Sequence, residues 1–514
     1  MEMKTINHFI SGAIVPLAAL TLTLGFTACS DDDKDNITQP ERNWSTDGGL
    51  RAADNLLFDG NVIGNGDDEF VFTGKQTLPK GTYTLKGFVY IADGAELTIE
   101  PGTIIKGDKQ TKGTLIVERG GKLYAQGSST QPIVFTSAQA AGNRRPGDWG
   151  GLILCGRAPH NAGEAQIEGG PRTKHGGDQP ADCSGALSYV RIEFAGYPYE
   201  TDKEINGLTL GSVGSGTQLD HIQVSYSNDD SFEWFGGNVN AKYLVAYKGW
   251  DDDFDTDNGY SGNVQFALSV RDARIADKSQ SNGFESDNDA SGSSASPRTS
   301  CTFSNVTFIG PKLTADDFVN DASYITGGSL NPNNGSGLGK FQAAMHIRRG
   351  SRLNCINSLA AGWPIGVIYD GEKGDTQTAA EAGQLSLNHV WLADMDITGS
   401  DANKLYSDVL VTGYDANKQP VTDATQTSFS SRFFQAGAGN QNVAFSTLSL
   451  QASTYAPSLT TPVVPAAGSP LIGAAGWDGI TADYFSRVNY IGAFAAGDNW
   501  LNGWTEFDPQ NAAY

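Results

Sequence analysis

The sequence predicts an all-β solenoid, a stack of short strands wound into regular coils. Three observations favour this class: a nine-residue pattern occurs twice at an offset of 22 residues, the neighbouring strands keep that offset, and helical periodicity is nearly absent until the C-terminal part. The two copies of D-D-x-F-[E/D]-x-x-x-G begin at Asp229 and Asp251. A fixed period of about 20 residues is typical of coils that stack directly on one another.

The apolar strands beside the two copies predict the register between coils. Two sets of residues recur at steps of 22: Ile222, Leu244 and Phe266, and then Val224, Ala246 and Leu268. Equivalent side chains are therefore expected about one strand spacing, ~4.8 Å, apart. A third F-[E/D] core begins at Phe284, 30 residues after Phe254, which predicts an insertion that loops out of that coil.

The N-terminal residues predict an export signal that is not part of the fold. Lys4 precedes an apolar stretch over residues 9–26, and a small-residue cleavage site ends at Cys29. Polar residues interrupt the stretch, so it fits a signal peptide better than a transmembrane span. We expect residues 1–28 to be a lipoprotein signal peptide, Cys29 to carry the lipid, and residues 29–50 to form a flexible polar tether.

The residues after Cys29 bear on localisation. Ser30-Asp31-Asp32-Asp33 resembles the S-[D/E]-[D/E]-[D/E] export signal of surface lipoproteins in Bacteroidota-type Gram-negative bacteria. The resemblance implies a protein of the outer membrane, held there only by its lipid anchor and exposed on the cell surface. An ordinary solvated acidic tether is the alternative interpretation.

Composition narrows the choice of partner. The formal net charge is −23 and no basic stripe is present, which argues against nucleic acid because phosphates would not be neutralised. A divalent cation or a neutral ligand fits this charge better. The 63 glycines are dispersed, as expected for a fold with many tight turns.

The pattern along the chain predicts one long domain over residues 51–495. Shorter coils come first, since Leu97 and Leu115 are 18 residues apart. Insertions without strand periodicity are expected near residues 156–186 and 311–340, and a short helix near 429–436. The aromatic segment 496–514 is predicted to cap an open end of the solenoid, which would otherwise present unpaired strand edges.

Several longer strings resemble one known group of proteins. They are GAELTIEPGTIIKG, PIVFTS, GDWGGLILCGRAP, EINGLTLGSVGSGT, DDSFEWFGGNVN and the closing YIGAF. These strings are similar to right-handed parallel β-helix lipoproteins of the pectate-lyase-like superfamily. The resemblance implies a right-handed parallel β-helix, but the superfamily includes lyases, hydrolases, adhesins and structural modules, so it does not choose a function.

Stacked coils would bring acidic residues into columns. Segment 227–290 carries 13 acids and five bases. Two carboxylates at about 4.8 Å repel by roughly 1 kcal/mol in water and roughly 3–4 kcal/mol at an effective dielectric near 20. We therefore predict a cation site, with calcium as the ion because it takes about six to eight oxygen ligands. Catalysis and a merely solvated turn are the alternatives. The predicted ligands are Asp230, Glu233, Asp252, Asp255, Asp257, Glu285 and Asp287.

Aromatic residues flank these acids. If exposed, Trp234, Trp250 and Tyr260 would form a sugar-stacking platform, whereas if buried they would belong to the core. Lys248 would contact the ligand, or serve as the base of a lyase, unless it forms a salt bridge with the surplus acids. His346 is expected to be a packed strand residue.

Four cysteines follow Cys29, an even number in a compartment that permits oxidation. We predict the pairs Cys155–Cys183 and Cys301–Cys355, with four buried thiols as the alternative.

Together these features predict a cell-surface lipoprotein that acts without catalysis. It would present a long face to a glycan or to an outer-membrane protein partner, with a divalent cation site on its middle coils. The alternative is a calcium-dependent polysaccharide lyase or a glycoside hydrolase.

Overall fold

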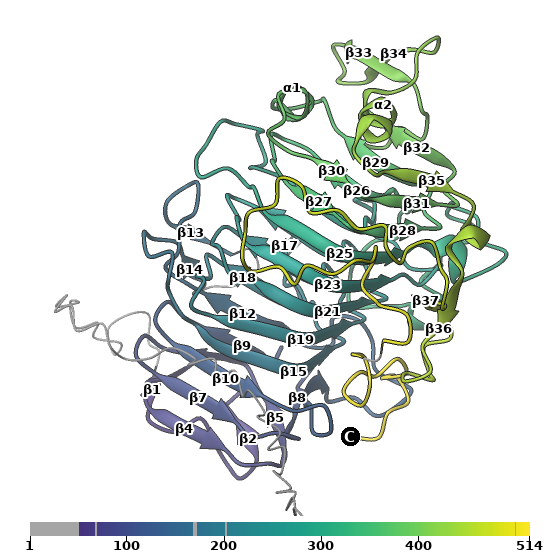
Figure 1. Ribbon diagram of the computed structural model, residues 1–514. Coiled ribbons are helices and arrows are strands. Elements are labelled where there is room, and N and C mark those ends of the chain that lie inside the picture. The colour runs from purple at the N-terminus through teal and green to yellow at the C-terminus, as the bar shows by residue number, and fades with distance from the viewer. Residues whose placement is uncertain (1–50, 67–68, 168–171, 201–202, 499) are drawn as a thin grey trace, which may run out of the picture.

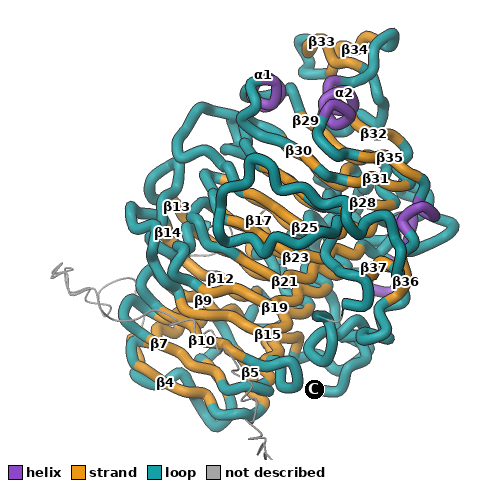
Figure 2. Tube along the Cα trace, in the orientation of Figure 1, coloured by secondary structure: helices purple, strands orange, loops and turns teal. Residues whose placement is uncertain are grey.

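The computed structural model describes residues 51–514 except 67–68, 168–171, 201–202 and 499, so the predicted signal peptide, Cys29 and the tether lie outside the described residues. The described chain winds into a stack of coils that starts at β1 and rises to α2 (Figure 1). Strands dominate and helices are few and short (Figure 2). No helix among the described residues combines the length and apolarity that a membrane span requires.

One parallel sheet runs the length of the stack and is called sheet A here. Each coil adds one strand, and each strand pairs only with the coils below and above it. In spatial order the strands are β1 (Arg51–Ala53), β3 (Phe70–Phe72), β6 (Phe88–Ile91), β9 (Thr114–Val117), β12 (Gly151–Cys155), β18 (Leu208–Gly211), β20 (Phe232–Phe235), β22 (Phe254–Asp257), β24 (Phe284–Ser286), β26 (Ala343–Ile347), β29 (Ile365–Tyr369) and β32 (Ile397–Ser400).

The second parallel sheet, sheet B, covers the other side of the core. Its middle coils each contribute one long strand: β15 (Gly185–Glu193), β19 (Gln218–Ser225), β21 (Ala241–Tyr247), β23 (Asn263–Val270) and β25 (Thr302–Ile309). Toward both ends the coils contribute shorter strands: β2 (Val62–Ile63), β4 (Lys75–Leu78), β5 (Thr82–Leu85), β7 (Glu96–Ile99), β8 (Ile104–Gly107), β10 (Lys122–Gln126), β11 (Ile133–Ser137), β27 (Asn354–Ile356), β28 (Leu359–Ala361), β30 (Leu387–Asn388), β31 (Trp391–Ala393) and β35 (Gln441–Val443).

The predicted stacking of the repeat is confirmed. Phe232 pairs with Phe254, and Phe254 with Phe284, so the insertion before Phe284 leaves the register intact. The Phe232 and Phe254 rings stack in the core with centroids 5.6 Å apart. The fold is therefore the expected right-handed parallel β-helix.

One part of the predicted register is wrong. Ile222 pairs with Leu244 as expected, but Leu244 pairs with Ala267 and not with Phe266. The extra residue lies between β22 and β23, because Phe235 pairs with Asp257 at an offset of 22 but Ala241 pairs with Val264 at an offset of 23. Each long strand of sheet B bends at a residue with positive φ, and Phe266 (φ 59°) occupies that bend above Tyr243 (φ 58°). The bend shifts the alternation of inward and outward side chains by one residue, since Ala241 and Leu244 on either side of Tyr243 both lie in the core.

Two insertions and several short elements cover the coils. The insertion at 156–186 holds the hairpin of β13 (Ala165–Gln166) and β14 (Lys174–His175), and Ile167 packs over lower strands of sheet A. The insertion at 311–340 contains η1 (Pro311–Leu313) and η2 (Gly328–Leu330). The remaining elements are β16 (Pro198–Glu200), β17 (Lys203–Glu204), α1 (Thr376–Glu381), β33 (Leu410–Tyr414), β34 (Pro420–Asp423), the expected helix α2 (Phe429–Ala436), η3 (Phe445–Leu448), β36 (Leu450–Ala452) and β37 (Pro462–Pro465).

The C-terminal segment does not cap an end of the solenoid. Residues 485–514, called the strap here, run back along the flank of sheet B to the first coils, where the chain ends beside β8 (Figure 1). Lys106 Nζ of β8 donates a hydrogen bond of 2.8 Å to the carbonyl oxygen of Tyr514. Trp504 is fully buried against the coils. The aromatic residues of 496–514 thus cover a side face, which corrects the predicted cap.

A candidate cation site on sheet A

The middle strands of sheet A carry a column of charged side chains on their outer face. Glu233 pairs with Asp255, Asp255 with Glu285, and Glu285 with His346. Side chains alternate along a strand, so the neighbours Phe232 and Phe254 point into the core while the acids point outward. The predicted acidic column is therefore present, and it continues into a histidine.

Carboxylate oxygens converge in three overlapping groups along this face. Within each group one oxygen from every member lies within 4.8 Å of the others. Neighbouring groups share Asp230 or Asp255, so they form a continuous row. The groups are Asp229, Asp230 and Asp251; Asp230, Glu233 and Asp255; and Asp252, Asp255 and Glu285.

Backbone hydrogen bonds explain why an aspartate recurs at the start of each motif. The Asp252 N–H donates to Asp230 Oδ1 at 2.8 Å, and the Asn282 N–H donates to Asp252 Oδ1. Each aspartate thus holds the turn of the coil above it. This fixes one oxygen of each carboxylate and leaves the other for a ligand.

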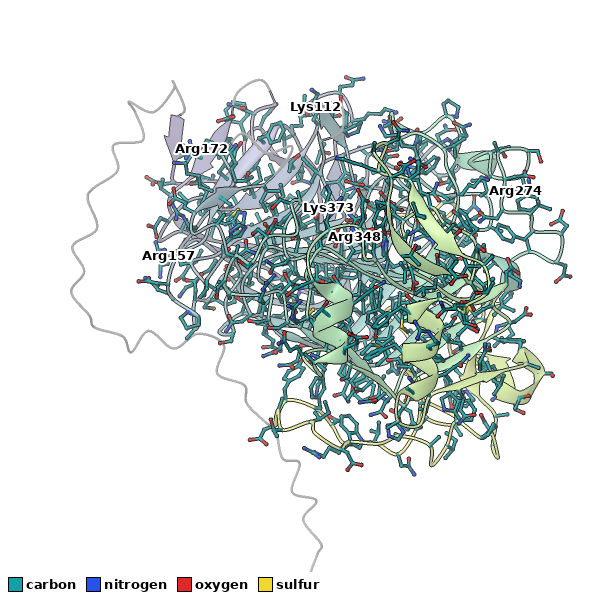
Figure 3. The ribbon with its side chains drawn as sticks, turned by 90° about the horizontal axis from the view of Figure 1, so that it is seen from above. Lys112, Arg157, Arg172, Arg274, Arg348 and Lys373 are labelled. Carbon is teal, nitrogen blue, oxygen red and sulfur yellow. The ribbon has the colours of Figure 1, made fainter. Side chains whose placement is uncertain are left out.

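Basic side chains neutralise the upper end of the row. The Arg348 guanidinium contacts Glu285 and donates to Asp287 Oδ1 at 2.8 Å, and Arg349 lies 2.6 Å from Asp287 Oδ2. His346 Nδ1 lies 3.1 Å from Glu285 Oε2. Arg348 lies near the middle of the view in Figure 3, whereas Arg274 lies at the periphery. Glu233, lower in the row, forms no salt bridge with a basic side chain among the described residues, and its Oε2 contacts the Asn206 amide instead.

Buried oxygen atoms without a partner lie in the same region. Asp251 Oδ1, Asp255 Oδ1 and Asn206 Oδ1 are shielded from solvent and form no hydrogen bond with described groups. Asn206 is 2% exposed, and its Nδ2 contacts Glu233 Oε2. Unpaired buried acceptors are costly, at roughly 1–3 kcal/mol each and more for charged groups. Oxygen-ligated cations along the row would satisfy acceptors of this kind.

Burial and mutual repulsion change the acidity of the row. Burial, followed by the neighbouring carboxylates, raises the pKa of Asp230, Glu233 and Asp255 well above the usual range. Burial and then Asp287 raise the pKa of Asp257 to about 8. Burial opposes ionisation of Glu285 too, but Arg348 and His346 bring its pKa below the usual value. Burial and repulsion thus favour the protonated forms of the lower carboxylates, and a cation that joined them would favour their ionised forms.

Five of the seven predicted ligands meet in the row. Asp257 and Asp287 lie beyond it, and Asp287 is occupied by the two arginines. Asp229 and Asp251 belong to the row but were not predicted as ligands. The signal for them was present, because they are the first residues of the two copies of the repeat.

The predicted aromatic platform is wrong. Trp234, Trp250 and Tyr260 are each 0% exposed. Trp234 is an inward residue of β20 and stacks on Tyr260 with centroids 5.4 Å apart. The Trp250 indole N–H donates to the Gly337 carbonyl at 2.8 Å, beneath the insertion at 311–340. These rings belong to the packed interior and cannot contact a glycan.

Lys248 is not a ligand of the row. Its ammonium lies 3.4 Å from Asp272 Oδ2 and 5.1 Å from the centre of the Tyr247 ring. The alternative interpretation, a salt bridge with a surplus acid, describes it correctly. His346 is fully buried, as expected for a packed strand residue.

The predicted disulfides are also wrong. Cys155, Cys301 and Cys355 are buried free thiols, so neither Cys155–Cys183 nor Cys301–Cys355 forms. Burial raises the pKa of the Cys301 and Cys355 thiols to about 12. Thiols this weakly acidic behave as small apolar core residues.

Parallel strands stacked in successive coils define the class of parallel β-helices. A comparison with known families supports this fold class and identifies the family. The chain belongs to the family described as Pectate-lyase like beta helix domain, whose profile matches residues 71–446. No curated protein and no solved structure matches the chain.

Proposed function

We propose that this protein is a surface-displayed, non-enzymatic glycan-binding or scaffold module whose acidic row holds calcium. The observation that carries the proposal is the set of three buried, unpartnered oxygens of Asp251, Asp255 and Asn206 beside the converging carboxylates of the row. Carboxylate and amide oxygens are the ligands that calcium prefers. Asp230, Glu233, Asp252 and Asp255 would hold the ion, and the ion would offer its remaining coordination positions to glycan hydroxyl or carboxylate oxygens.

The binding role is favoured over catalysis by the state of the basic side chains. A lyase needs a free base close to the sugar proton that it removes. Arg348 is engaged by Glu285 and Asp287, and Lys248 by Asp272. Both are thereby held in their charged forms. The outer-membrane localisation through Cys29, and an outer-membrane protein as an additional partner, remain part of the proposal and rest on the sequence.

One observation favours a second candidate, a glycoside hydrolase. Such enzymes need a carboxylic acid that is protonated near neutral pH beside a carboxylate that is ionised. The pKa of Asp257 is raised to about 8 by burial and by Asp287, while Arg348 and His346 keep Glu285 ionised. These two groups would be the acid and the base.

Binding of short oligosaccharides, measured by calorimetry with calcium and then with a chelator, tests the proposal. We expect at least one oligosaccharide to bind in calcium and to lose at least tenfold in affinity on chelation. The Asp255→Asn variant should bind weakly in both conditions. Asp178→Asn, which changes an exposed acid outside the row, is the matched control and should behave as wild type. Equal binding with and without calcium would contradict the proposed role of the ion.

Product analysis separates the two candidates. The bound oligosaccharide is incubated with the protein and examined for new reducing or unsaturated ends. We expect none. Release of ends that disappears in Asp257→Asn would instead establish the hydrolase.

A further inference from the structure

A second candidate site lies beside the upper coils. A cavity of about 360 Å³ opens between the insertion at 311–340, the start of β29, strand β32 and the loop after it. This volume is within the range of small-ligand sites, which begins at about 300 Å³. Its lining residues are Asn320, Lys340, Pro364, Asp396, Ile397 and Tyr406.

Tyr406 presents an aromatic ring in this cavity. Its hydroxyl donates to the Phe341 carbonyl at 2.8 Å and also contacts Gln280 Oε1. The polar atom is thus tied to the protein, yet the residue remains 38% exposed. An anchored ring with an exposed surface can stack on the apolar face of a sugar with little further loss of side-chain entropy.

The cavity also carries an unpaired cation. Lys340 Nζ lies 6.0 Å from the centre of the Tyr406 ring. It attracts the Asp321 carboxylate weakly but forms no salt bridge with an acid among the described residues. Asp396, the acid of the cavity, lies 2.7 Å from Lys312 Nζ and is already neutralised. The cavity therefore favours a negatively charged group.

The polar wall is preorganised. Asn320 Nδ2 donates to the Phe341 carbonyl at 2.8 Å, and the Phe341 N–H donates to Asn320 Oδ1 at 3.0 Å. A side-chain amide held at both ends keeps its orientation when a ligand enters, which lowers the entropic cost of binding.

Apolar exposure concentrates at the same place. Val319 adjoins Asn320, and Leu338 lies two residues before Lys340; they are 51% and 39% exposed. With Tyr406 they make up three of the six large apolar side chains that are exposed in the described chain. Clustered apolar exposure marks interaction sites, whereas single exposed residues carry no such meaning.

A short hydrogen-bonded path connects the cavity to the acidic row. Tyr406 contacts Gln280, whose carbonyl accepts a hydrogen bond of 3.1 Å from Asn282 Nδ2. The Asn282 backbone N–H in turn donates to Asp252 of the row. The cavity and the row are thus coupled through the protein interior, since Asn282 is fully buried.

We propose that this cavity is a saccharide subsite separate from the cation row, and that it takes one sugar ring bearing an anionic substituent. The ring stacks on Tyr406 and the anionic group pairs with Lys340. This inference deepens the proposed glycan-binding function and rests on it. The mixture of one aromatic ring, one free ammonium and fixed amide and carboxylate groups suits a sugar better than an apolar peptide side chain.

The test uses the full chain in calcium and, as probes, short neutral, uronate-containing and sulfated oligosaccharides. We expect the anionic probes to bind more tightly than the neutral ones. Tyr406→Ala should lower their affinity at least tenfold, and Lys340→Gln should remove the preference for anionic probes. Tyr406→Phe, which keeps the ring, should retain most of the affinity; loss there equal to that in Tyr406→Ala would mean that Tyr406 only supports the loop.

Matched controls are Tyr455→Ala and Lys418→Gln, an exposed tyrosine and an exposed lysine outside the cavity. Both should bind as wild type. Unchanged binding in Tyr406→Ala, with calcium dependence intact, would overturn the subsite and leave the proposed function standing. Absence of binding by wild type to every probe would overturn both. Circular dichroism of each variant confirms that the β-helix is folded.

Discussion

Two columns of polar side chains stack on the outside of this β-helix, and only one of them is closed by protein. On sheet B, the amides of Gln223, Gln265 and Asn305 are fully buried beneath the strap. Gln265 Nε2 donates to the Ser486 carbonyl at 2.8 Å, and the Ser486 N–H donates back to Gln265 Oε1 at 2.8 Å. Gln223 clamps Glu506 in the same way, at 2.7 and 2.8 Å.

The acidic row on sheet A has the opposite character. Its members also recur once per coil, but Asp251 Oδ1 and Asp255 Oδ1 find no partner among the described residues. Amides can satisfy one another through a strap of the same chain because peptide groups offer both a donor and an acceptor. Carboxylates only accept, so a stacked row of them needs donors or cations from outside. A column whose hydrogen-bonding groups all have partners within the protein is therefore structural. A column with unpartnered oxygens indicates a ligand.

The largest loss of stability is expected when hydrogen bonds between sheet B and the strap are removed. Gln265→Ala would remove both hydrogen bonds to Ser486 and the bond from Gln265 Nε2 to Asn305 Oδ1, and would leave a cavity at a fully buried position. At about 0.5–1.5 kcal/mol for each of these three hydrogen bonds, the free energy of unfolding should fall by about 1.5–4.5 kcal/mol, and the cavity adds to this loss. Urea denaturation measures this. Gln419→Ala, an exposed glutamine of the β33–β34 hairpin, should change stability by less than about 0.5 kcal/mol. A loss that small in Gln265→Ala would mean that the strap does not close its column.

A smaller effect, whose sign depends on calcium, is expected in the open column. In chelator near pH 8, Asp255→Asn removes repulsion and should raise the free energy of unfolding by about 1–3 kcal/mol. In calcium at 100 times its dissociation constant, the wild type gains about 2.7 kcal/mol that the variant lacks. The order of stability of the two proteins should therefore reverse when calcium is added.

Glu285→Gln is the matched control for this reversal. Glu285 is already neutralised by Arg348, so its loss leaves a guanidinium unpaired and should destabilise the protein in both conditions. If Asp255→Asn also destabilised the chelated protein, the row would be a structural column like that on sheet B.

The architecture and most of the row could be predicted from the sequence because both follow from local periodicity. An offset of 22 residues determines which side chains share a column. It predicts that Glu233 lies beside Asp255, and the structure confirms this pairing. The error at Trp234 was avoidable, since alternation along a strand turns Trp234 inward once Glu233 points outward. The period, rather than the residue type, determines which face a side chain joins.

The remaining errors arise from contacts between distant parts of the chain. Trp250 is buried because Gly337, 87 residues later, covers its indole. The strap reaches Gln223 from 283 residues away. Neither contact leaves a periodic trace in the sequence, so the burial of Trp250 and the path of the strap could not be inferred from the strands alone. The free thiols of Cys155, Cys301 and Cys355 are a further example, because disulfide formation depends on a geometry that sequence spacing does not give.

The smallest expected effect, counted per pH unit, is a pH dependence of the free energy of unfolding. Only the acidic side of sheet A should show it. The pKa of Asp257 is raised to about 8 by burial and by Asp287, whereas in the unfolded chain it is near 4. The folded protein therefore holds a proton that the unfolded chain has released. Stability in chelator should be highest below about pH 4 for this group and should fall as the pH rises toward about 8, with a slope of at most about 1.4 kcal/mol per pH unit for one proton.

Thermal melting in chelator between pH 5 and 9 measures this slope. Asp257→Asn should flatten it, whereas Gln265→Ala should lower stability equally at every pH, because an amide does not titrate. Calcium should flatten it as well, since an ion in the neighbouring row replaces the protons that the acids would otherwise hold. A slope that persisted in saturating calcium would place Asp257 outside the influence of the ion and restrict the cation to the three carboxylate groups around Asp230 and Asp255.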